Sequence, residues 1–265
     1  MSYTLSLFTK PWKEETPDEL GELAAGLGFN AIEFPLRTGY QVEPGNALKG
    51  LPALSRTLER YGVRIASVAS GTQEHIFAAC QEAGVPVIRI MLLSYGECDG
   101  YMQAESAWIR ELDELCPLCE KYGVRVAVQQ HQGQGVFSSM DLRHLLERTD
   151  TRYIGGIWDA AHSALAGEAP EKALDILWDY LILVNFKNAF YRRANGPEAE
   201  KARFGTYFTT SEHGAADWES AVRYLRSRSY EGVVCMPAEY TDTANVGRYI
   251  ARDVRTLKAM LEDRA

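Results

Sequence analysis

Polar side chains gather where the apolar, β-branched runs of this sequence end. They are Glu33, Gln129, His131, Asp159, His162, Asn185, Lys187 and Glu239. An imidazole titrates near neutral pH and can act as a general base, and a lysine ammonium can stabilise a developing oxyanion. Carboxylates and amides hydrogen-bond to hydroxyl groups. Together these groups suit proton transfer, with His131 or His162 as the base and Lys187 as the stabilising cation.

The spacing of four of these residues predicts which of them share a face. The run GVRVAVQQH ends in Gln129 and His131, and LVNFKN carries Asn185 and Lys187. Because side chains alternate along a strand, His131 is expected on the same face of its strand as Gln129, one layer higher, and Lys187 on the same face of its strand as Asn185. We therefore expect the catalytic groups to converge on one open pocket.

Three of the polar residues also have structural interpretations. Asp159 suits the N-cap of a helix that begins after it, a role compatible with a place in a site. His162 also suits a packed, hydrogen-bonded position under a loop. Glu33 suits an internal ion pair with Arg37 or Lys187, which is a common fate of buried charges.

Short strand-like runs alternate eight times with helical patterns along the chain. The expected strands are residues 3–8, 30–34, 63–69, 86–92, 124–130, 154–159, 181–187 and 232–236. Eight such units without a linker predict an α/β protein, a single (β/α)8 TIM barrel that spans residues 1–265. Thr16 and Glu19 form a capping-box pattern at the start of the first helix.

The barrel assignment places the polar residues on one face of the molecule. In this fold the site lies at the carboxyl ends of the strands. The long connection 189–216, after the seventh strand, is on that face and is a candidate lid or substrate loop. Residues 3–240 are expected to close the barrel, with a C-terminal helix from about Val246 packed outside it.

Composition excludes several classes of partner. The chain is 46% hydrophobic and 24% charged, with a formal net charge of −8, which disfavours nucleic-acid binding. The apolar run around 85–93 is interrupted by Arg89 and is shorter than the ~18 residues that a membrane span requires. The N-terminus lacks a leader pattern, so we expect a cytoplasmic protein. Cys116 and Cys119 form a CxxC pair, interpreted as apolar helix packing.

Six segments together resemble a known family. They are GFNAIEF, GVRVAVQQH, GIWDAAH, LVNFKN, GAADW and YEGVV. In this order, and over nearly the whole chain, they resemble the xylose-isomerase-like TIM barrels, the sugar isomerase/epimerase family. The resemblance implies a divalent cation held by Glu, Asp, His and Glu from strands five to eight, with the two glutamates as the acid/base pair.

The sequence departs from that family pattern at three of its four ligand positions. By position, the resemblance assigns them to Gln129, Asp159, Asn185 and Pro237. An amide cannot accept a proton as a carboxylate does, and proline offers no side-chain ligand. We expect no cofactor and no metal at this usual position. A divalent metal (Mn, Mg or Zn) is left open, and its candidate ligands are Asp159, His131, His162 and Glu239.

The resulting hypothesis is a sugar or keto-sugar isomerase/epimerase-like protein that moves a proton next to a carbonyl, with an altered or absent metal centre. The proposed catalytic residues are His131, His162 and Lys187. The proposed substrate-binding residues are Glu33, Gln129, Asp159, Asn185 and Glu239. The alternative is a non-catalytic carbohydrate-binding barrel or partner subunit. The expected ligand is a small carbohydrate, and a homo-oligomer is left open.

Overall fold

Eight parallel strands close into a barrel in the computed structural model, which describes residues 3–96 and 98–262. In chain order the barrel strands are β1 (Thr4–Phe8), β2 (Ala31–Pro35), β3 (Arg64–Ala69), β4 (Val87–Ile90), β5 (Arg125–Gln129), β6 (Ile154–Asp159), β7 (Leu181–Asn185) and β10 (Val233–Met236). Around the barrel their order is β1-β10-β7-β6-β5-β4-β3-β2. The predicted (β/α)8 barrel is confirmed, and each strand coincides with an expected run to within a few residues.

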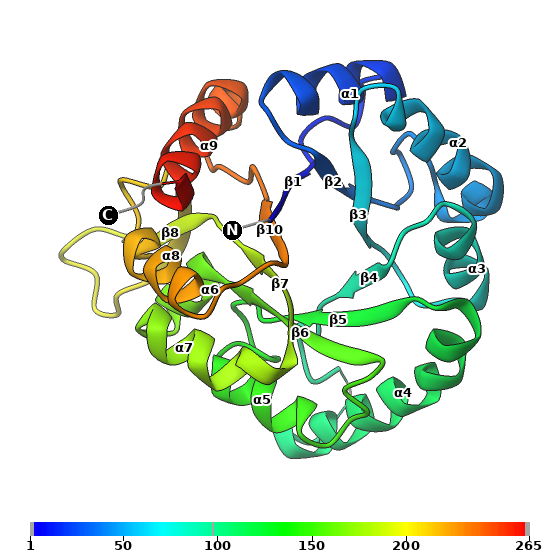
Figure 1. The fold of residues 1–265 in the computed structure, drawn as a ribbon. Helices are drawn as coiled ribbons and strands as arrows, with labels where there is room; N and C mark the ends of the chain where they lie inside the picture. Colours follow the sequence, from blue (N-terminus) through cyan, green and yellow to red (C-terminus); the bar gives the residue numbers. More distant parts are fainter. Residues whose placement is uncertain (1–2, 97, 263–265) are drawn as a thin grey trace.

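The helices form an outer ring around the strands (Figure 1). They are α1 (Pro17–Gly26), α2 (Ala47–Glu59), α3 (Glu74–Glu82), α4 (Tyr101–Tyr122), α5 (Ser139–Leu146), α6 (Ala160–Leu165), α7 (Pro170–Leu177), α8 (Trp218–Ser227) and α9 (Val246–Glu262), with the 3-10 turns η1 (Pro44–Asn46), η2 (Trp178–Tyr180) and η3 (Thr243–Asn245). The capping box of Thr16 and Glu19 begins α1 as predicted. Helix α9 lies outside the barrel beside α8, as expected (Figure 1).

The barrel interior changes from apolar to polar along the strands. An apolar layer fills its middle: Phe8, Ala69, Val87, Ala127, Ile157, Leu183 and Cys235. Two residues further along four of these strands come Arg89, Gln129, Asp159 and Asn185, all buried. Because strand side chains alternate with a period of two, these polar residues point to the same interior, one layer nearer the carboxyl ends. The apolar layer therefore forms the floor of the polar site.

The connection after β7 contains an antiparallel hairpin that the sequence analysis did not predict. Strand β8 (Asn188–Arg193) pairs with β9 (Phe204–Thr209). The Phe208 amide donates to Thr241 Oγ1 at 2.9 Å, and the Thr241 amide donates to the Phe208 carbonyl at 3.0 Å. These bonds join the hairpin to the loop after β10, at the carboxyl ends of the strands.

Two features bear on the other sequence expectations. Within residues 3–96 and 98–262, no helix is long and apolar enough to cross a membrane. Cys116 and Cys119 are free thiols on α4, and burial raises the pKa of Cys119 to about 11. A thiol with so high a pKa stays protonated and unreactive at neutral pH, which agrees with the packing interpretation.

Candidate active site

Asp159 is the centre of the polar layer. At the end of β6 it is fully buried, and its Oδ1 accepts the His162 amide at 3.1 Å as the N-cap of α6. Its Oδ2 accepts Gln129 Nε2 at 2.7 Å and Asn185 Nδ2 at 3.3 Å, and lies 3.6 Å from Lys187 Nζ. The capping role and the place in the cluster therefore coexist. Asn185 and Lys187 reach the same carboxylate, as their two-residue spacing predicts.

The Gln129 amide links Asp159 to a second ion pair. Its Oε1 accepts Arg89 Nη1 at 2.7 Å, while Arg89 Nη2 pairs with Glu33 Oε1 at 2.5 Å. Ser67 donates its hydroxyl to Glu33 Oε2 at 3.0 Å. The reversed amide would place its oxygen against a carboxylate and its NH2 against a guanidinium, so these partners determine its orientation.

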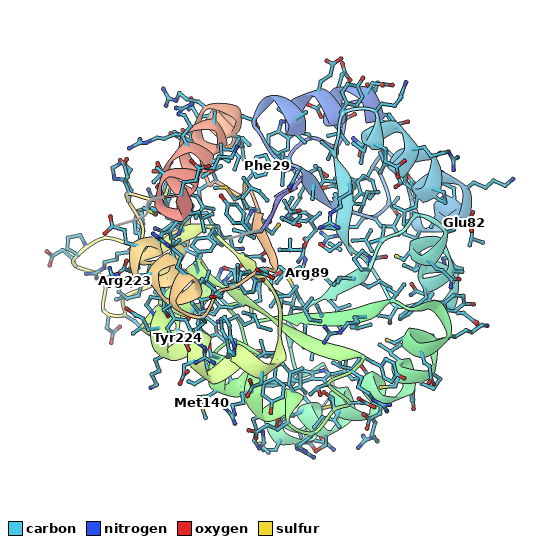
Figure 2. All side chains as sticks on the ribbon, in the orientation of Figure 1. Phe29, Glu82, Arg89, Met140, Arg223 and Tyr224 are labelled. Carbon is cyan, nitrogen blue, oxygen red and sulfur yellow. The ribbon has the colours of Figure 1, made fainter. Side chains whose placement is uncertain are left out.

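The predicted partners of Glu33 were wrong. Its ion pair is with Arg89, and not with Arg37 or Lys187. Arg89 lies inside the ring of strands (Figure 2), two strands from Glu33, whereas Arg37 lies beyond the end of β2. The signal was present in the sequence, because an arginine that interrupts the apolar run 86–92 two residues after Val87 points inward with it.

Lys187 and Glu239 form the next part of the network. Lys187 Nζ donates to Glu239 Oε2 at 3.1 Å, and Lys10 pairs with the other oxygen of Glu239. Burial lowers the pKa of Lys187, but the carboxylates of Asp159 and Glu239 outweigh it and leave that pKa raised. Burial opposes the ionisation of Glu239, but Lys187 and Lys10 hold the pKa of Glu239 well below its ordinary value. Both groups are therefore charged at neutral pH.

The backbone leaves the strand conformation between the end of β10 and Glu239. Strand β10 ends at Met236, immediately before Pro237. This was predicted, because proline has no backbone N–H to donate to a neighbouring strand. Ala238 then takes a left-handed conformation, with φ of 52°. Lys10 was missed by the sequence analysis, although it follows the inward-facing Phe8 by two residues.

His131 and His162 stack with their ring centroids 4.0 Å apart. His131 Nδ1 lies 2.8 Å from the carbonyl of Gln132, so it carries the hydrogen and leaves a lone pair on Nε2. The Gln132 amide donates to His162 Nδ1 at 3.3 Å, which places the His162 hydrogen on Nε2. Burial, and then the charge of Lys187, lowers the pKa of both imidazoles. Both are therefore neutral at pH 7.

A cavity of about 720 Å³ opens beside this cluster. Its wall includes His131, Gln132, Glu239, Lys10, Trp12, Tyr40 and Phe208. Of the three predicted catalytic side chains, only His131 lines it among the described residues. Phe208 covers the other two, because its ring lies 5.0 Å from Lys187 Nζ and 6.0 Å, between centroids, from His162. The expectation that all three line one open pocket is therefore not met.

The donor set at the four family positions does not fit a divalent cation. Gln129 and Asn185 turn their NH2 groups toward Asp159, and Pro237 offers no side-chain donor. The buried Lys187 ammonium already supplies positive charge next to Asp159. In the described part of the chain, no three His, Cys, Asp or Glu side chains are placed to hold a metal ion.

The barrel and its site define the class of protein. The chain belongs to the xylose isomerase-like TIM barrel family, whose model matches residues 22–260. Among curated relatives, the inosose dehydratase of Salmonella typhimurium is 23% identical over 250 residues, which cover 86% of this chain and 82% of that protein. The inosose dehydratase of Lactiplantibacillus plantarum is 25% identical over 142 residues, 49% of this chain, and the match spans about half of that relative (47%).

Solved structures show the same fold at low sequence identity. D-psicose 3-epimerase from Clostridium cellulolyticum has a TM-score of 0.74 and 12% identity, covering 98% of this chain and 100% of that one. The probable 3-DHS dehydratase AsbF from Bacillus anthracis has a TM-score of 0.76 and 15% identity, with both chains fully covered. The IOLI protein, solved with a zinc atom, has a TM-score of 0.71 and 15% identity, covering 97% and 96% of the two chains. At these identities the likeness shows a shared fold.

Proposed function

We propose that the protein is a sugar or keto-sugar isomerase or epimerase that moves a proton next to a carbonyl without a metal at the usual family position. One observation carries this proposal: a neutral His131 with an unprotonated Nε2 lines the cavity beside the charged Glu239 and Lys187. A general base is most effective when its pKa lies near the working pH, and the lowered pKa of His131 keeps its Nε2 free to accept a proton at neutral pH.

The cavity wall suits a carbohydrate. Trp12, Tyr40 and Phe208 offer aromatic surfaces to the C–H faces of a sugar ring. Glu239, ionised and partly exposed, accepts hydrogen bonds from hydroxyl groups, and Lys10 donates to sugar oxygens. These contacts orient the carbon next to the carbonyl toward His131.

Proton transfer follows from the charges around His131. Its Nε2 takes the proton from that carbon and leaves an enolate. For isomerisation the imidazolium returns the proton on the same face to the neighbouring carbon, while the hydroxyl proton passes from one substrate oxygen to the other. For epimerisation water delivers a proton to the opposite face of the first carbon, and His131 releases its own proton to solvent. Lys187 does not line the cavity, so its fixed positive charge acts at a distance, from a buried and poorly screened position, on the oxygen that becomes negative. Lys187 also keeps Glu239 ionised.

We assign His162 a positioning role in place of the predicted role as base. Its Nδ1 holds the Gln132 amide, and the carbonyl of Gln132 holds His131 Nδ1–H. This chain of contacts selects the tautomer of His131. We propose in the same way that Glu33, Gln129, Asp159 and Asn185 support the cavity from below, and that Glu239 contacts the substrate. A cytoplasmic location and a small carbohydrate as partner stay predictions.

The test is exchange of substrate protons with solvent. Purified protein is incubated in D2O with a panel of ketoses and aldoses, and NMR follows the proton next to the carbonyl. We expect exchange in wild type, a loss of at least ~100-fold in His131→Gln, the lower range for a general base, and no change in His213→Gln, an exposed control.

Two outcomes would count against this function. Equal exchange in His131→Gln and wild type would remove His131 as the base. Binding of sugars in a thermal-shift assay without exchange of any substrate proton would favour the carbohydrate-binding alternative. That alternative has some support in the internal pairing of Lys187 and the burial of His162.

A further inference from the structure

A second cavity, of about 790 Å³, lies over the ends of β2, β3 and β4. Its polar wall consists of Arg37, Ser70, Thr72, Gln73, His75 and Arg89. Every one of these side chains can donate a hydrogen bond, and among the described wall residues there is no aspartate or glutamate. The chain as a whole has 36 acidic and 28 basic residues. Arg89 is paired with Glu33 behind this wall, so Arg37 is the residue that brings uncompensated positive charge to a wall without carboxylates.

Two observations indicate that this wall is prepared for a ligand. Arg37 is partly buried and makes no ion pair with any described residue. Ser70 Oγ and Arg89 Nε are buried and have no hydrogen-bond partner among the described residues. Buried polar atoms without partners are uncommon in folded proteins, so a bound group that accepts hydrogen bonds would complete the site.

The second cavity is coupled to the first through two contacts. Arg89, in its wall, also donates to Gln129, which donates to Asp159 in the catalytic cluster. In the loop after β2, the Tyr40 amide donates to the Arg37 carbonyl at 3.3 Å, and Tyr40 lines the first cavity. One turn of chain, residues 37–40, thus contributes a residue to the wall of each cavity.

We propose that the second cavity binds the anionic group of the substrate, a carboxylate or a phosphate, with Arg37 as its principal ligand. This inference rests on the proposed function, because the carbon skeleton of the same molecule then occupies the first cavity next to His131. The substrate class becomes an acidic sugar, either a sugar acid or a sugar phosphate. Arginine is suited to this role because its planar guanidinium binds two oxygens of such a group at once.

Four related probes distinguish the contribution of the anionic group to binding from that of the sugar ring. Binding of D-glucose, D-glucuronate, D-glucose 6-phosphate and inorganic phosphate is measured by calorimetry in wild type, Arg37→Gln and Lys49→Gln. Lys49 is an exposed cation on α2 that does not line the cavity. We expect one acidic probe to bind at least about tenfold more tightly than D-glucose, a preference of ~1.4 kcal/mol. Arg37→Gln abolishes that preference and Lys49→Gln keeps it. The glucuronate and phosphate arms show which anion is preferred.

The location of the anion is read from His75, which lines the second cavity. Inorganic phosphate should shift the ring signals of His75, assigned with His75→Gln, and leave those of His144 on α5 unchanged. Equal, weak shifts in wild type and Arg37→Gln would mean adventitious binding and would overturn the proposal. So would an absence of any preference for acidic probes.

Failure of the anion site is distinguishable from failure of the proposed function. Solvent exchange of neutral sugars through His131, without any anion preference, would leave the function standing and remove the inference. Anion binding at Arg37 without proton exchange on any probe would keep the anion site and remove the proposed function. The cavity would then bind an anion that is no substrate of His131.

Discussion

The side-chain amide of Gln129 donates a hydrogen bond to Asp159 over 2.7 Å, from the end of one barrel strand to the end of the next. Two carboxylates at these positions would need a cation between them. The amide instead supplies its own donor, and Asn185 and Lys187 add two more nitrogen groups around the same carboxylate oxygen. The negative charge of Asp159 is thus compensated by side chains of the protein.

Gln129→Glu should destabilise the protein by about 1–3 kcal/mol at pH 7, the cost of losing the donor to a buried charged group. The new carboxylate keeps the bond from Arg89 but faces Asp159 with an oxygen. Urea unfolding measures the change, and Gln103→Glu, an exposed position on α4, controls for added charge. Because one of the facing carboxyl groups protonates more readily, the loss should shrink toward pH 5. An unchanged midpoint would show that Gln129 does not support Asp159.

Lys187→Met should cost about 3–5 kcal/mol, because removing one partner of a buried ion pair leaves uncompensated charge. Lys187 is 4% exposed and Asp159 is fully buried. Urea midpoints provide the measurement, with Lys201→Met on the hairpin connection as the exposed control. Adding Glu239→Gln to Lys187→Met should recover part of the loss. A cost below about 1 kcal/mol, typical of exposed pairs, would contradict this account.

Stability should fall as the pH drops below the ordinary histidine value of about 6.5. The pKa values of His131 and His162 are lowered in the folded state, so below that value the unfolded chain binds more protons than the folded one. Stability is thus complete above pH about 6.5 and is lost on acidification, by up to ~1.4 kcal/mol per pH unit for each histidine.

The pH effect can be assigned by variants. His162→Gln should remove one histidine's share of the slope between pH about 6.5 and about 5, whereas His213→Gln, on an exposed loop, should leave the slope unchanged. Unfolding curves in urea at several pH values provide the comparison. Identical slopes in wild type and His162→Gln would show that the buried imidazole is not held neutral by the fold.

The sequence predicted the parts of this structure that depend on local periodicity. The strands follow from their apolar runs. The spacing of Asn185 and Lys187 predicts that both side chains lie on one face, where both approach the Asp159 carboxylate. The Arg89–Glu33 pair did not follow, because β2 and β4 are separated by β3 and a sequence does not state which inward side chains meet across a barrel. Strand parity alone could still have placed Arg89 inside.

The covering of Lys187 and His162 also lay beyond sequence reasoning. It depends on the β8–β9 hairpin, whose partner is the loop after β10, some thirty residues away in the chain. The aromatic ring of Phe208 comes to lie over both side chains because of that tertiary contact. No local pattern encodes such a position, so the predicted open pocket included two residues that the structure buries.

The most direct test of a metal-independent proton transfer is the rate of solvent deuterium exchange, on the best substrate of the sugar panel, before and after chelation. Protein dialysed against EDTA, with its metal content measured, is compared with the same protein after addition of MnCl2, MgCl2 or ZnCl2. We predict equal rates in all samples and loss of exchange in His131→Gln, because Lys187 and His131 supply the charge and the base. Exchange that disappears on chelation and returns with one metal would contradict the account.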